Sequence, residues 1–354
     1  PEFAYSADKW ASLRDNVMEY GELADLVHEY NPTVRSNRST LSDKKNQDLT
    51  EINDKLLSDA MDLWDDASST DTDSYMGRMT AANLDFAGNT LAQTADKNFM
   101  DAEMYKISYD QTEANLVFQA QQLMTTYKQS AYTMENLNAN RALAQASYEA
   151  TVARQAAGMA TQTEVLTSLK NVQDIDANIL SAQKSTDNVY RSLLLMLGWS
   201  ADSQPEIRDI PEPDLARIGA MDPDADREQA LANNYEIKSD EHKLQNLKTN
   251  EQADATKADL EDKRNQVYSS LKTQYNAVLD AKDALDAANI KLQLETVSMN
   301  AASAKAATGN ISALELIQQQ TSYTTAKNSV ETGKMQLTLA MEKYDWIKKG
   351  LTFS

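Results

Sequence analysis

The chain contains 354 residues, with 34 Lys and Arg against 54 Asp and Glu, which gives a formal net charge of −20. A protein this acidic repels polyanions, so its charge argues against nucleic acid as a partner. The chain has no Cys, which excludes disulfides, thiolate metal sites and a cysteine nucleophile. Its two histidines, His28 and His242, have no nucleophile motif beside them. We therefore expect no enzymatic activity, no metal and no other cofactor.

Residues that interrupt helices are few and unevenly placed, with 9 Gly and 6 Pro in the whole chain. Four of the prolines fall close together, at Pro205, Pro211, Pro213 and Pro223. Proline breaks helices because it lacks the backbone N–H and clashes with the preceding turn. The pattern predicts an all-α protein with a first helical repeat at 1–199, a proline-rich linker at 200–223 and a second helical repeat at 224–354.

In chain order, the first helix-entry signal is Asn31-Pro32, and Asp222-Pro223 repeats it in the second half. In each pair a side-chain oxygen can cap the helix, and proline suits the first helical position. Between them lies the polar run 67–89, which contains Gly77 and Gly88 and reads as a loop between two helices. Two later segments, at about 95–157 and 255–308, are free of proline and are expected to form long helices.

The most informative pattern is a repeat around Gly158 and Gly309, which are 309 − 158 = 151 residues apart. A glycine can take the left-handed conformation that ends one helix, and a hydroxyl three residues later can cap the next. The residues that fit a capping box are Thr161 and Glu164 in the first copy, and Ser312 and Glu315 in the second. The sequence therefore predicts two tight helical hairpins, with tips near 158–161 and 309–312.

Apolar residues beyond each glycine alternate by three and four positions, which predicts left-handed coiled-coil packing. They begin with Val172, Ile175 and Ile179 in the first copy, and with Tyr323, Ala326 and Val330 in the second. The helix before Gly309 has two stripes, one of large residues from Leu271 to Leu292 and one of alanines from Ala277 to Ala288. A helix of this kind packs on both flanks, as in a bundle layer or a wall of helices; an ordinary antiparallel coiled coil is the alternative.

These motifs, in this order, resemble those of the TolC-like outer membrane efflux proteins, also called outer membrane factors. Each half of that family begins with an Ala-Leu…Asn-Pro type helix, to which 24–34 and 230–237 are similar. Each half also carries a Gly-x-x-Ser/Thr-x-x-Asp/Glu-Val-Leu hairpin, to which 158–166 and 309–317 are similar. The first half closes with a Leu-rich segment ending in glycine, similar to 193–198, so the resemblance covers nearly the whole chain.

The resemblance implies a homotrimer whose helices form a hollow tunnel, through which substrates pass unchanged. It implies a place in the cell envelope, outside the cytoplasmic membrane. The implied partners are a periplasmic adaptor (membrane fusion) protein and its inner-membrane transporter. The tip that docks on the adaptor would comprise Gly158, Met159, Ala160, Thr161, Gly309, Asn310, Ile311 and Ser312. The alternative interpretation is that these are turn residues with no further role.

The chain departs from the family pattern where the family has its membrane β-strands, between the entry helix and the long helix of each half. Neither 67–89 nor 247–264 shows the alternating polarity or the aromatic girdle of membrane strands. We therefore expect little or no β-structure, in a relative that lacks the membrane strands and does not insert into an outer membrane.

Two other classes of function fit the composition. A structural filament or cell-surface protein of the flagellin type is also Cys-free, acidic and rich in Ala, Gln and Asn, but it pairs its terminal helices instead of repeating a hairpin. A helical pore-forming toxin needs a concealed apolar hairpin, and the longest purely apolar run here covers only 193–197. The repeated hairpin favours an export conduit over both.

Overall fold

The computed structural model describes residues 5–13, 15–247 and 249–353. Of these residues 83% are helical and 1% lie in strands, which confirms the predicted all-α fold with little β-structure. The one sheet in the described ranges pairs β1 (Val17–Met18) with β2 (Glu206–Ile207) in parallel. No helix there has both the length and the apolar character needed to cross a bilayer.

The chain divides into two compact units, and each unit takes segments from both halves of the sequence. Unit 1 consists of 1–31, 115–224 and 271–346, and unit 2 consists of 32–114, 225–270 and 347–354. The three longest helices each contribute to both units. The boundaries of the compact units therefore differ from those of the sequence repeats.

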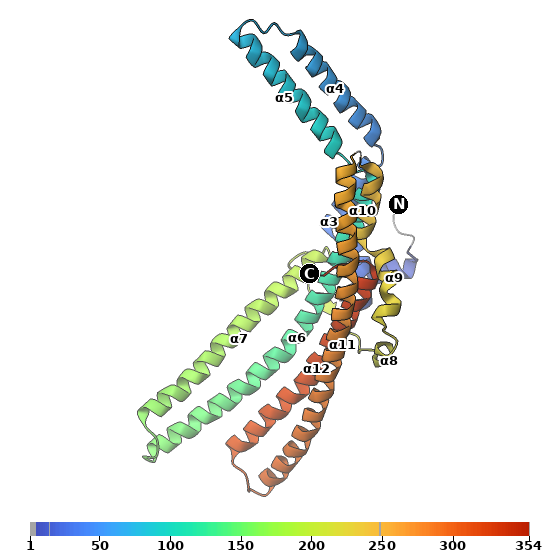
Figure 1. Cartoon of the computed structure of the whole chain (residues 1–354). Coiled ribbons are helices and arrows are strands. Elements are labelled where there is room, and N and C mark those ends of the chain that lie inside the picture. Colours follow the sequence, from blue (N-terminus) through green and yellow to red (C-terminus); the bar gives the residue numbers. More distant parts are fainter. Residues whose placement is uncertain (1–4, 14, 248, 354) are drawn as a thin grey trace. The chain divides into compact units, whose positions relative to one another are not determined.

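Unit 1 contains two antiparallel helical hairpins (Figure 1). The first is made by α6 (Ala102–Ala156) and α7 (Gln162–Met196), and the second by α11 (Asn250–Ala307) and α12 (Ala313–Lys349). Of these helices, α6 from residue 115, α11 from residue 271 and α12 up to residue 346 belong to unit 1.

Contacts between neighbouring helices fix the order of the four rods. An ion pair between Arg141 and Asp176 joins α6 to α7, at 2.5 Å between Nε and Oδ1. The Asn328 amide of α12 donates to Asn136 Oδ1 of α6 at 2.9 Å. The Gln274 amide of α11 donates to the Ala340 carbonyl of α12 at 2.9 Å. The order is therefore α7, α6, α12, α11, with α7 and α11 at the two edges of the layer.

The core of unit 1 is spread along the helix seams. Buried residues recur at seven-residue spacings at Leu271, Val278 and Leu285 of α11, and at Val330, Leu337 and Tyr344 of α12. Regular spacing of this kind is the signature of coiled-coil packing, in which each side chain fits between residues of the facing helix. Burial therefore accumulates along the length of each rod, and a helix with one covered seam can still expose a second face.

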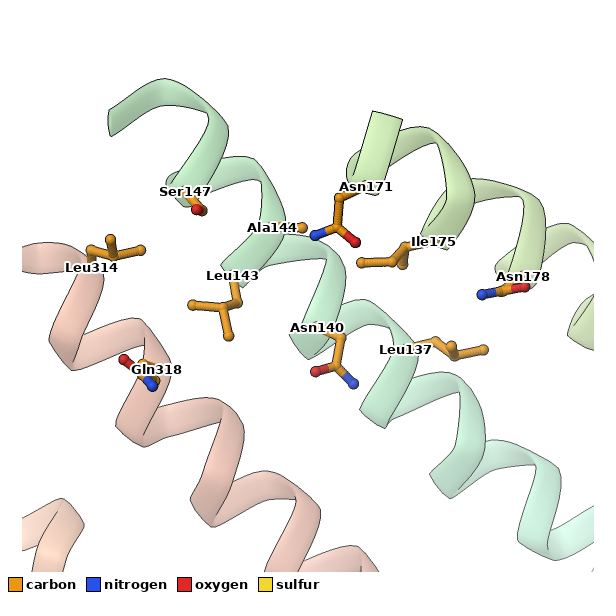
Figure 2. Close-up of a pocket in the computed structure, with 10 residues that line it drawn as sticks. All are labelled: Leu137, Asn140, Leu143, Ala144, Ser147, Asn171, Ile175, Asn178, Leu314 and Gln318. Atoms are coloured by element: carbon orange, nitrogen blue, oxygen red, sulfur yellow. The ribbon is translucent and has the colours of Figure 1, made fainter. Parts of the chain in front are cut away.

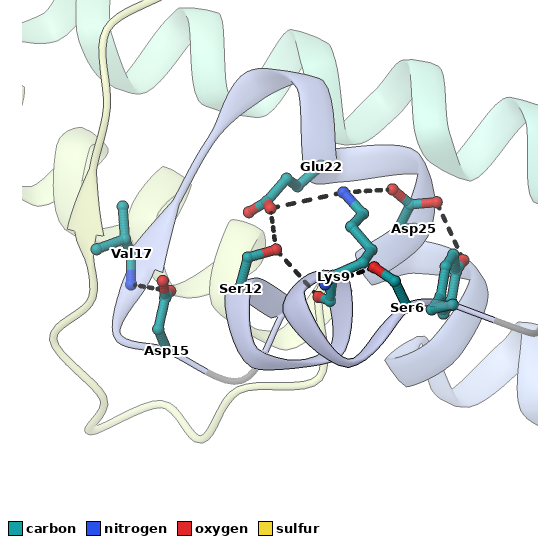
Figure 3. A network of polar contacts seen from close by, with 8 residues as sticks. Ser6, Lys9, Ser12, Asp15, Val17, Glu22 and Asp25 are labelled. Carbon is teal, nitrogen blue, oxygen red and sulfur yellow. Dashed lines mark hydrogen bonds and ion pairs between the residues drawn. The ribbon is translucent and has the colours of Figure 1, made fainter.

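The N-terminal segment of unit 1 is held by a polar network around Lys9 (Figure 3). Lys9 belongs to α1 (Ala7–Leu13), and its Nζ lies 2.9 Å from Asp25 of α2 (Leu23–Tyr30) and 3.5 Å from Glu22 of the 3₁₀ turn η1 (Tyr20–Glu22). Burial lowers the pKa of Lys9, but the hydrogen bond and charge of Asp25 outweigh it and raise the pKa above its ordinary value. The network fixes α1 on α2, and the Asn31 amide beyond α2 donates to the Met196 carbonyl at 2.8 Å.

Unit 2 is organised around the junction between α5 (Tyr75–Lys97) and α6. The Asp101 carboxylate accepts from the Met104 backbone N–H at 2.9 Å and from the Asn246 amide at 2.8 Å. Its Oδ2 also lies 2.6 Å from His242 Nε2. Burial raises the pKa of Asp101, but these partners outweigh it and lower the pKa. This cluster attaches α10 (Tyr235–Asn246) to the start of α6.

Three further helices belong to these units. Unit 2 contains α3 (Pro32–Lys44), which begins at the proline that the entry signal predicts, and most of α9 (Pro223–Asn233), which does the same. The short α8 (Leu215–Ile218) lies in unit 1, within the segment between the two halves of the sequence.

The prediction of a loop at 67–89 is wrong. This interval belongs to a helical hairpin made by α4 (Leu49–Ser69) and α5, and only 70–74 separates the two helices. Gly88 does not break α5, because it serves close packing: a Cβ at this position would lie 2.6 Å from Nε1 of Trp64 on α4. Asp48 and Ser74 cap the two helices, and the many polar residues between them face solvent.

The second interval expected to lack strands, 247–264, lies in α11 from residue 250 onward. Lys248 is outside the described residues. Both intervals are therefore mainly helical, except for 70–74 in the first and residues 247 and 249 in the second, but they differ in kind. The first half has an additional hairpin, and the second half passes directly from α10 into a helix of 58 residues.

Replacement of Gly88 tests the packing of the α4–α5 hairpin. We expect Gly88→Ala to destabilise the hairpin by about 1–3 kcal/mol, because the new methyl group displaces the Trp64 ring. The measurement is amide hydrogen exchange of 49–97 together with Trp fluorescence. Asn89→Ala, at the exposed neighbouring position, is the matched control and should leave exchange unchanged or slower. Equal exchange in Gly88→Ala and the wild type would contradict the proposed close contact.

Candidate functional site

The first hairpin tip is a glycine-terminated turn. Gly158 has a φ of 75°. Its N–H donates to the Gln155 carbonyl at 2.8 Å, and the Met159 N–H donates to the Arg154 carbonyl at 2.8 Å. This pair of hydrogen bonds is the Schellman motif, in which a residue in the left-handed region closes the last turn of a helix.

The cap of the following helix is made by Thr161 and Glu164. The Glu164 N–H donates to Thr161 Oγ1 at 3.2 Å, and the Thr161 N–H donates to Glu164 Oε2 at 2.6 Å. The two residues thus satisfy each other's free backbone donors, as in a capping box. The α6–α7 turn is therefore closed on both sides within a few residues.

The second tip, between α11 and α12, repeats this arrangement. Gly309 has a φ of 69°. The Gly309 N–H donates to the Ala306 carbonyl at 3.1 Å, and the Asn310 N–H donates to the Lys305 carbonyl at 2.8 Å. The Glu315 N–H donates to Ser312 Oγ at 3.1 Å, and the Ser312 N–H donates to Glu315 Oε2 at 3.0 Å. Both turns thus have the same hydrogen bonds, 151 residues apart.

The turn residues themselves are accessible. Ala160 and Ile311 are half-buried, and the other six predicted tip residues are exposed. Met159 is the most prominent, because 65% of its surface is exposed. No neighbouring atom lies within 4 Å of the Cβ position of either glycine. The tips therefore present backbone and one large apolar side chain on rigid turns.

The carboxylates of the capping boxes are held in their charged form. Hydrogen bonds from the backbone and the side chain of Thr161 lower the pKa of Glu164. The side chain and the backbone of Ser312 lower the pKa of Glu315 in the same way. These glutamates therefore have a structural role that requires no partner and no substrate.

An open groove of about 580 Å³ lies along the helices that lead to the tips, between the first hairpin and α12 (Figure 2). Its ten lining residues are Leu137, Asn140, Leu143, Ala144, Ser147, Asn171, Ile175, Asn178, Leu314 and Gln318. They come from α6, α7 and α12, and none of them is charged, in a chain of which 25% of residues are charged. The groove combines apolar side chains with carboxamides, which suits a helix that packs by apolar contact and side-chain hydrogen bonds.

Sequence reasoning places the candidate site at the turns and misses this groove. One signal was available: 316–326 contains no charged residue, although Glu315 and Lys327 flank it. That run supplies Gln318 of the groove and Thr321, whose hydroxyl donates to the Ala139 carbonyl of α6 at 3.3 Å. An uncharged stretch on a long helix is compatible with packing against α6 and also with lining a groove. The sequence alone does not distinguish these two arrangements.

Three solved structures share the architecture of this chain. The outer-membrane channel OprN matches with a TM-score of 0.60 at 11% identity, over 99% of this chain and 94% of that one. The CmeC outer membrane channel of Campylobacter jejuni matches with a TM-score of 0.57 at 10% identity, over 99% and 89%. The outer membrane protein VceC of Vibrio cholerae matches with a TM-score of 0.52 at 12% identity, over 94% and 96%. The chain has a TolC-like fold.

The TolC-like fold confirms the resemblance seen in the order of the sequence motifs. It comes from structure alone, since no protein-family model and no curated protein matches the sequence. The matches cover nearly all of this chain, so both hairpins with their turns belong to the shared architecture.

The two histidines lie outside the tips of this TolC-like chain. His242 contacts Asp101 in the α10–α6 cluster, and His28 Nε2 lies 3.8 Å from Glu29 in α2. In the parts of the chain that the structure describes, no group of three or more acidic or histidine side chains is arranged to hold a metal ion.

Acidification tests the role of the two capping glutamates. Because their folded-state pKa values lie below the ordinary 4.5, their stabilisation is present above that pH and is lost as the pH falls through the lower folded-state values. We expect protection of amides in 158–166 and 309–317, corrected for intrinsic exchange rates, to fall below about pH 4.5. The double variant Glu164→Gln, Glu315→Gln should flatten this dependence, whereas Glu149→Gln should not. An unchanged dependence in the double variant would show that other groups control the tips.

Proposed function

We propose that the chain is a subunit of a passive export conduit in the cell envelope, in which three copies close a tunnel. The two sequence repeats, 1–199 and 224–354, joined by the linker 200–223, each supply one hairpin to the tunnel wall. The TolC-like fold supports this proposal, because the matching structures include outer-membrane channels. Substrates would pass without chemical change.

The observation that carries the proposal is an uncovered apolar stripe on α11. It consists of Ala287, Ile290, Leu294, Val297, Ala301 and Ala304, all of which are exposed. The three large residues, Ile290, Leu294 and Val297, are 68%, 63% and 68% exposed. Their spacing alternates between three and four residues, as in a coiled-coil seam that lacks its second helix. Exposed stripes of this size and regularity mark interaction surfaces.

The position of the stripe supports another copy of the chain as its partner. Because α11 lies at one edge of the four-helix layer of unit 1, its free face has no neighbouring helix in that layer, and we expect a helix from another copy of the chain to cover it. The opposite edge is α7, on which Leu166 and Leu180 are 55% and 53% exposed. Contact between opposite edges of identical subunits is heterologous, and it forms a ring when the rotation between subunits closes.

The tips and the groove are the surfaces proposed for the adaptor protein. The tip residues 158–161 and 309–312 are rigid and largely exposed, and the groove offers an uncharged seat for a helix. A helical hairpin of the adaptor would contact both the tips and the groove. The adaptor would in turn bind an inner-membrane transporter. Since the groove has no charge, we expect salt to affect this contact little.

The same α11 stripe also supports the second candidate function, a structural filament. Heterologous contacts that do not close produce open helical assemblies instead of rings. The two functions therefore differ in the mass of the assembly: a conduit has a fixed number of subunits, whereas a filament grows with concentration.

Charged substitutions on the α11 stripe test the proposed ring. We expect the wild-type protein to give a native mass of three times 39.3 kDa, and Ile290→Asp, Val297→Asp to lose the trimer at concentrations at which the wild type is trimeric, because two carboxylates cannot be buried in an apolar seam. Leu215→Asp on α8, at a position 51% exposed, is the control and should remain trimeric. A wild-type protein that is monomeric at every concentration would contradict the conduit, and fibres in electron micrographs would favour the filament.

Photo-crosslinking from the groove tests adaptor docking. A benzophenone amino acid at Gln318 should capture, in the cells that make the protein, a polypeptide with a long helical hairpin. The same group at Asn188, an exposed position of α7 outside the groove residues, should not capture it. Capture from both positions, or from neither, would count against the groove as a docking surface.

A further inference from the structure

The α4–α5 hairpin of unit 2 has an apolar face that the proposed conduit does not use. On α5, Tyr75 is 69% exposed, Met79 45% and Phe86 75%. Together with the exposed Ala82, these positions recur at spacings of four, three and four residues. We call Tyr75, Met79, Ala82 and Phe86 the α5 stripe. Large apolar side chains with this period on one helix face form a coiled-coil seam when a partner covers them.

The α5 stripe is separate from the seam inside the hairpin. The inner seam is lined by small and apolar residues at 77, 81, 84, 88, 91 and 95, of which Gly88 and Ala95 are buried. At about 100° per residue the two sets of positions lie on opposite sides of α5. Trp64 already fills the space at Gly88, so α4 covers the inner seam and leaves the α5 stripe without a partner in the described chain.

Charge on the hairpin restricts what can cover the α5 stripe. The acidic residues of α4 are Glu51, Asp54, Asp59, Asp62, Asp65 and Asp66, against Lys55 alone. In α5, by contrast, Arg78 and Lys97 balance Asp85 and Asp96. Helices that lie on membrane surfaces are rich in Lys and Arg, so the acidic α4 disfavours a lipid surface as the partner. Two α4 helices would repel each other, whereas two α5 helices would not.

The heptad register of α5 fits a parallel contact between copies of this helix. Met79 and Phe86 occupy a positions, and Tyr75 and Ala82 occupy d positions. The flanking positions are Met76 and Asn83 on one side, and Arg78 and Asp85 on the other. A parallel association therefore places no two like charges side by side. Beyond Phe86 the seam positions become Asn89 and Gln93, so the apolar contact is confined to the first half of α5.

We propose that the α5 stripes of the three copies meet in a parallel coiled coil, with the acidic α4 helices outside. This contact is a second association surface of the protein, independent of the α11 stripe in unit 1. The partner of each α5 stripe is the α5 stripe of another copy of the chain. That three copies take part rests on the proposed conduit. The α4–α5 hairpin occurs only in the first half of the chain. Each trimer would therefore have a single bundle of three α5 helices surrounded by three α4 helices.

Cysteine crosslinking of the full-length chain tests this contact directly, because the natural chain contains no Cys. Phe86→Cys should form disulfide-linked dimers under mild oxidation, since the same residue of two copies meets in a parallel coiled coil. Thr80→Cys is the matched control, because position 80 lies on α5 well away from the stripe, and it should stay monomeric on denaturing gels. Equal crosslinking at both positions, or none at Phe86→Cys, would overturn the proposal.

A second variant separates this proposal from the proposed conduit. We expect Met79→Asp, Phe86→Asp to raise the concentration needed for half-maximal assembly by about tenfold or more, with helical content unchanged. If the wild type is trimeric but this variant assembles equally well, the α5 contact is wrong and the conduit stands. If Phe86→Cys crosslinks while the native mass is not that of a trimer, the α5 contact stands and the conduit is wrong. Flotation with phosphatidylcholine or phosphatidylglycerol vesicles that depends on Phe86 would identify lipid as the partner and overturn the proposal.

Discussion

Helices with two apolar faces need neighbours on two sides, and the rest of this structure depends on that constraint. In unit 1 each long helix is too thin to bury a core alone, so burial is distributed along seams between successive rods. The two inner rods, α6 and α12, have a neighbour on each side. The rods at the edges have only one neighbour each, and α11 still carries apolar residues on its free face. The layer therefore folds with the contacts available inside one chain, but it leaves apolar side chains exposed on α11.

The turns permit this architecture because their stabilising hydrogen bonds are made by residues within the turns themselves. At each tip a glycine in the left-handed region ends one helix, and a hydroxyl–glutamate pair starts the next. All of these hydrogen bonds are local, so the rods can reverse direction without a supporting core. The tips remain rigid and exposed at the same time, and the groove is lined by side chains without charge. This combination supports the proposal that the tips and the groove are where a helical partner binds.

The features that sequence reasoning could predict are those determined by neighbouring residues. The positions of Pro32 and Pro223 mark helix starts, and the hydrogen bonds at Gly158 and Gly309 are the ones expected from the spacing of glycine, hydroxyl and glutamate. The order of such motifs along the chain was sufficient to predict the TolC-like fold. That the same tips dock on an adaptor stays a prediction.

The features that sequence reasoning missed depend on contacts between distant residues. Gly88 looks like a helix breaker, but it is required where Trp64 crosses α5, and that contact cannot be read from either residue alone. The groove joins α12 to two helices more than a hundred residues earlier in the chain. The compact units also cut across both sequence repeats, because long helices contribute to more than one cluster of contacts.

The proposed conduit requires that another copy of the chain cover the free face of α11. Hydroxyl-radical footprinting of the wild-type protein over a range of concentrations measures this directly, because it reports the solvent exposure of each side chain. We expect labelling of Ile290, Leu294 and Val297 to fall together as the protein assembles, while Leu215 remains labelled at every concentration. Labelling of all four residues that does not change with concentration would contradict the account.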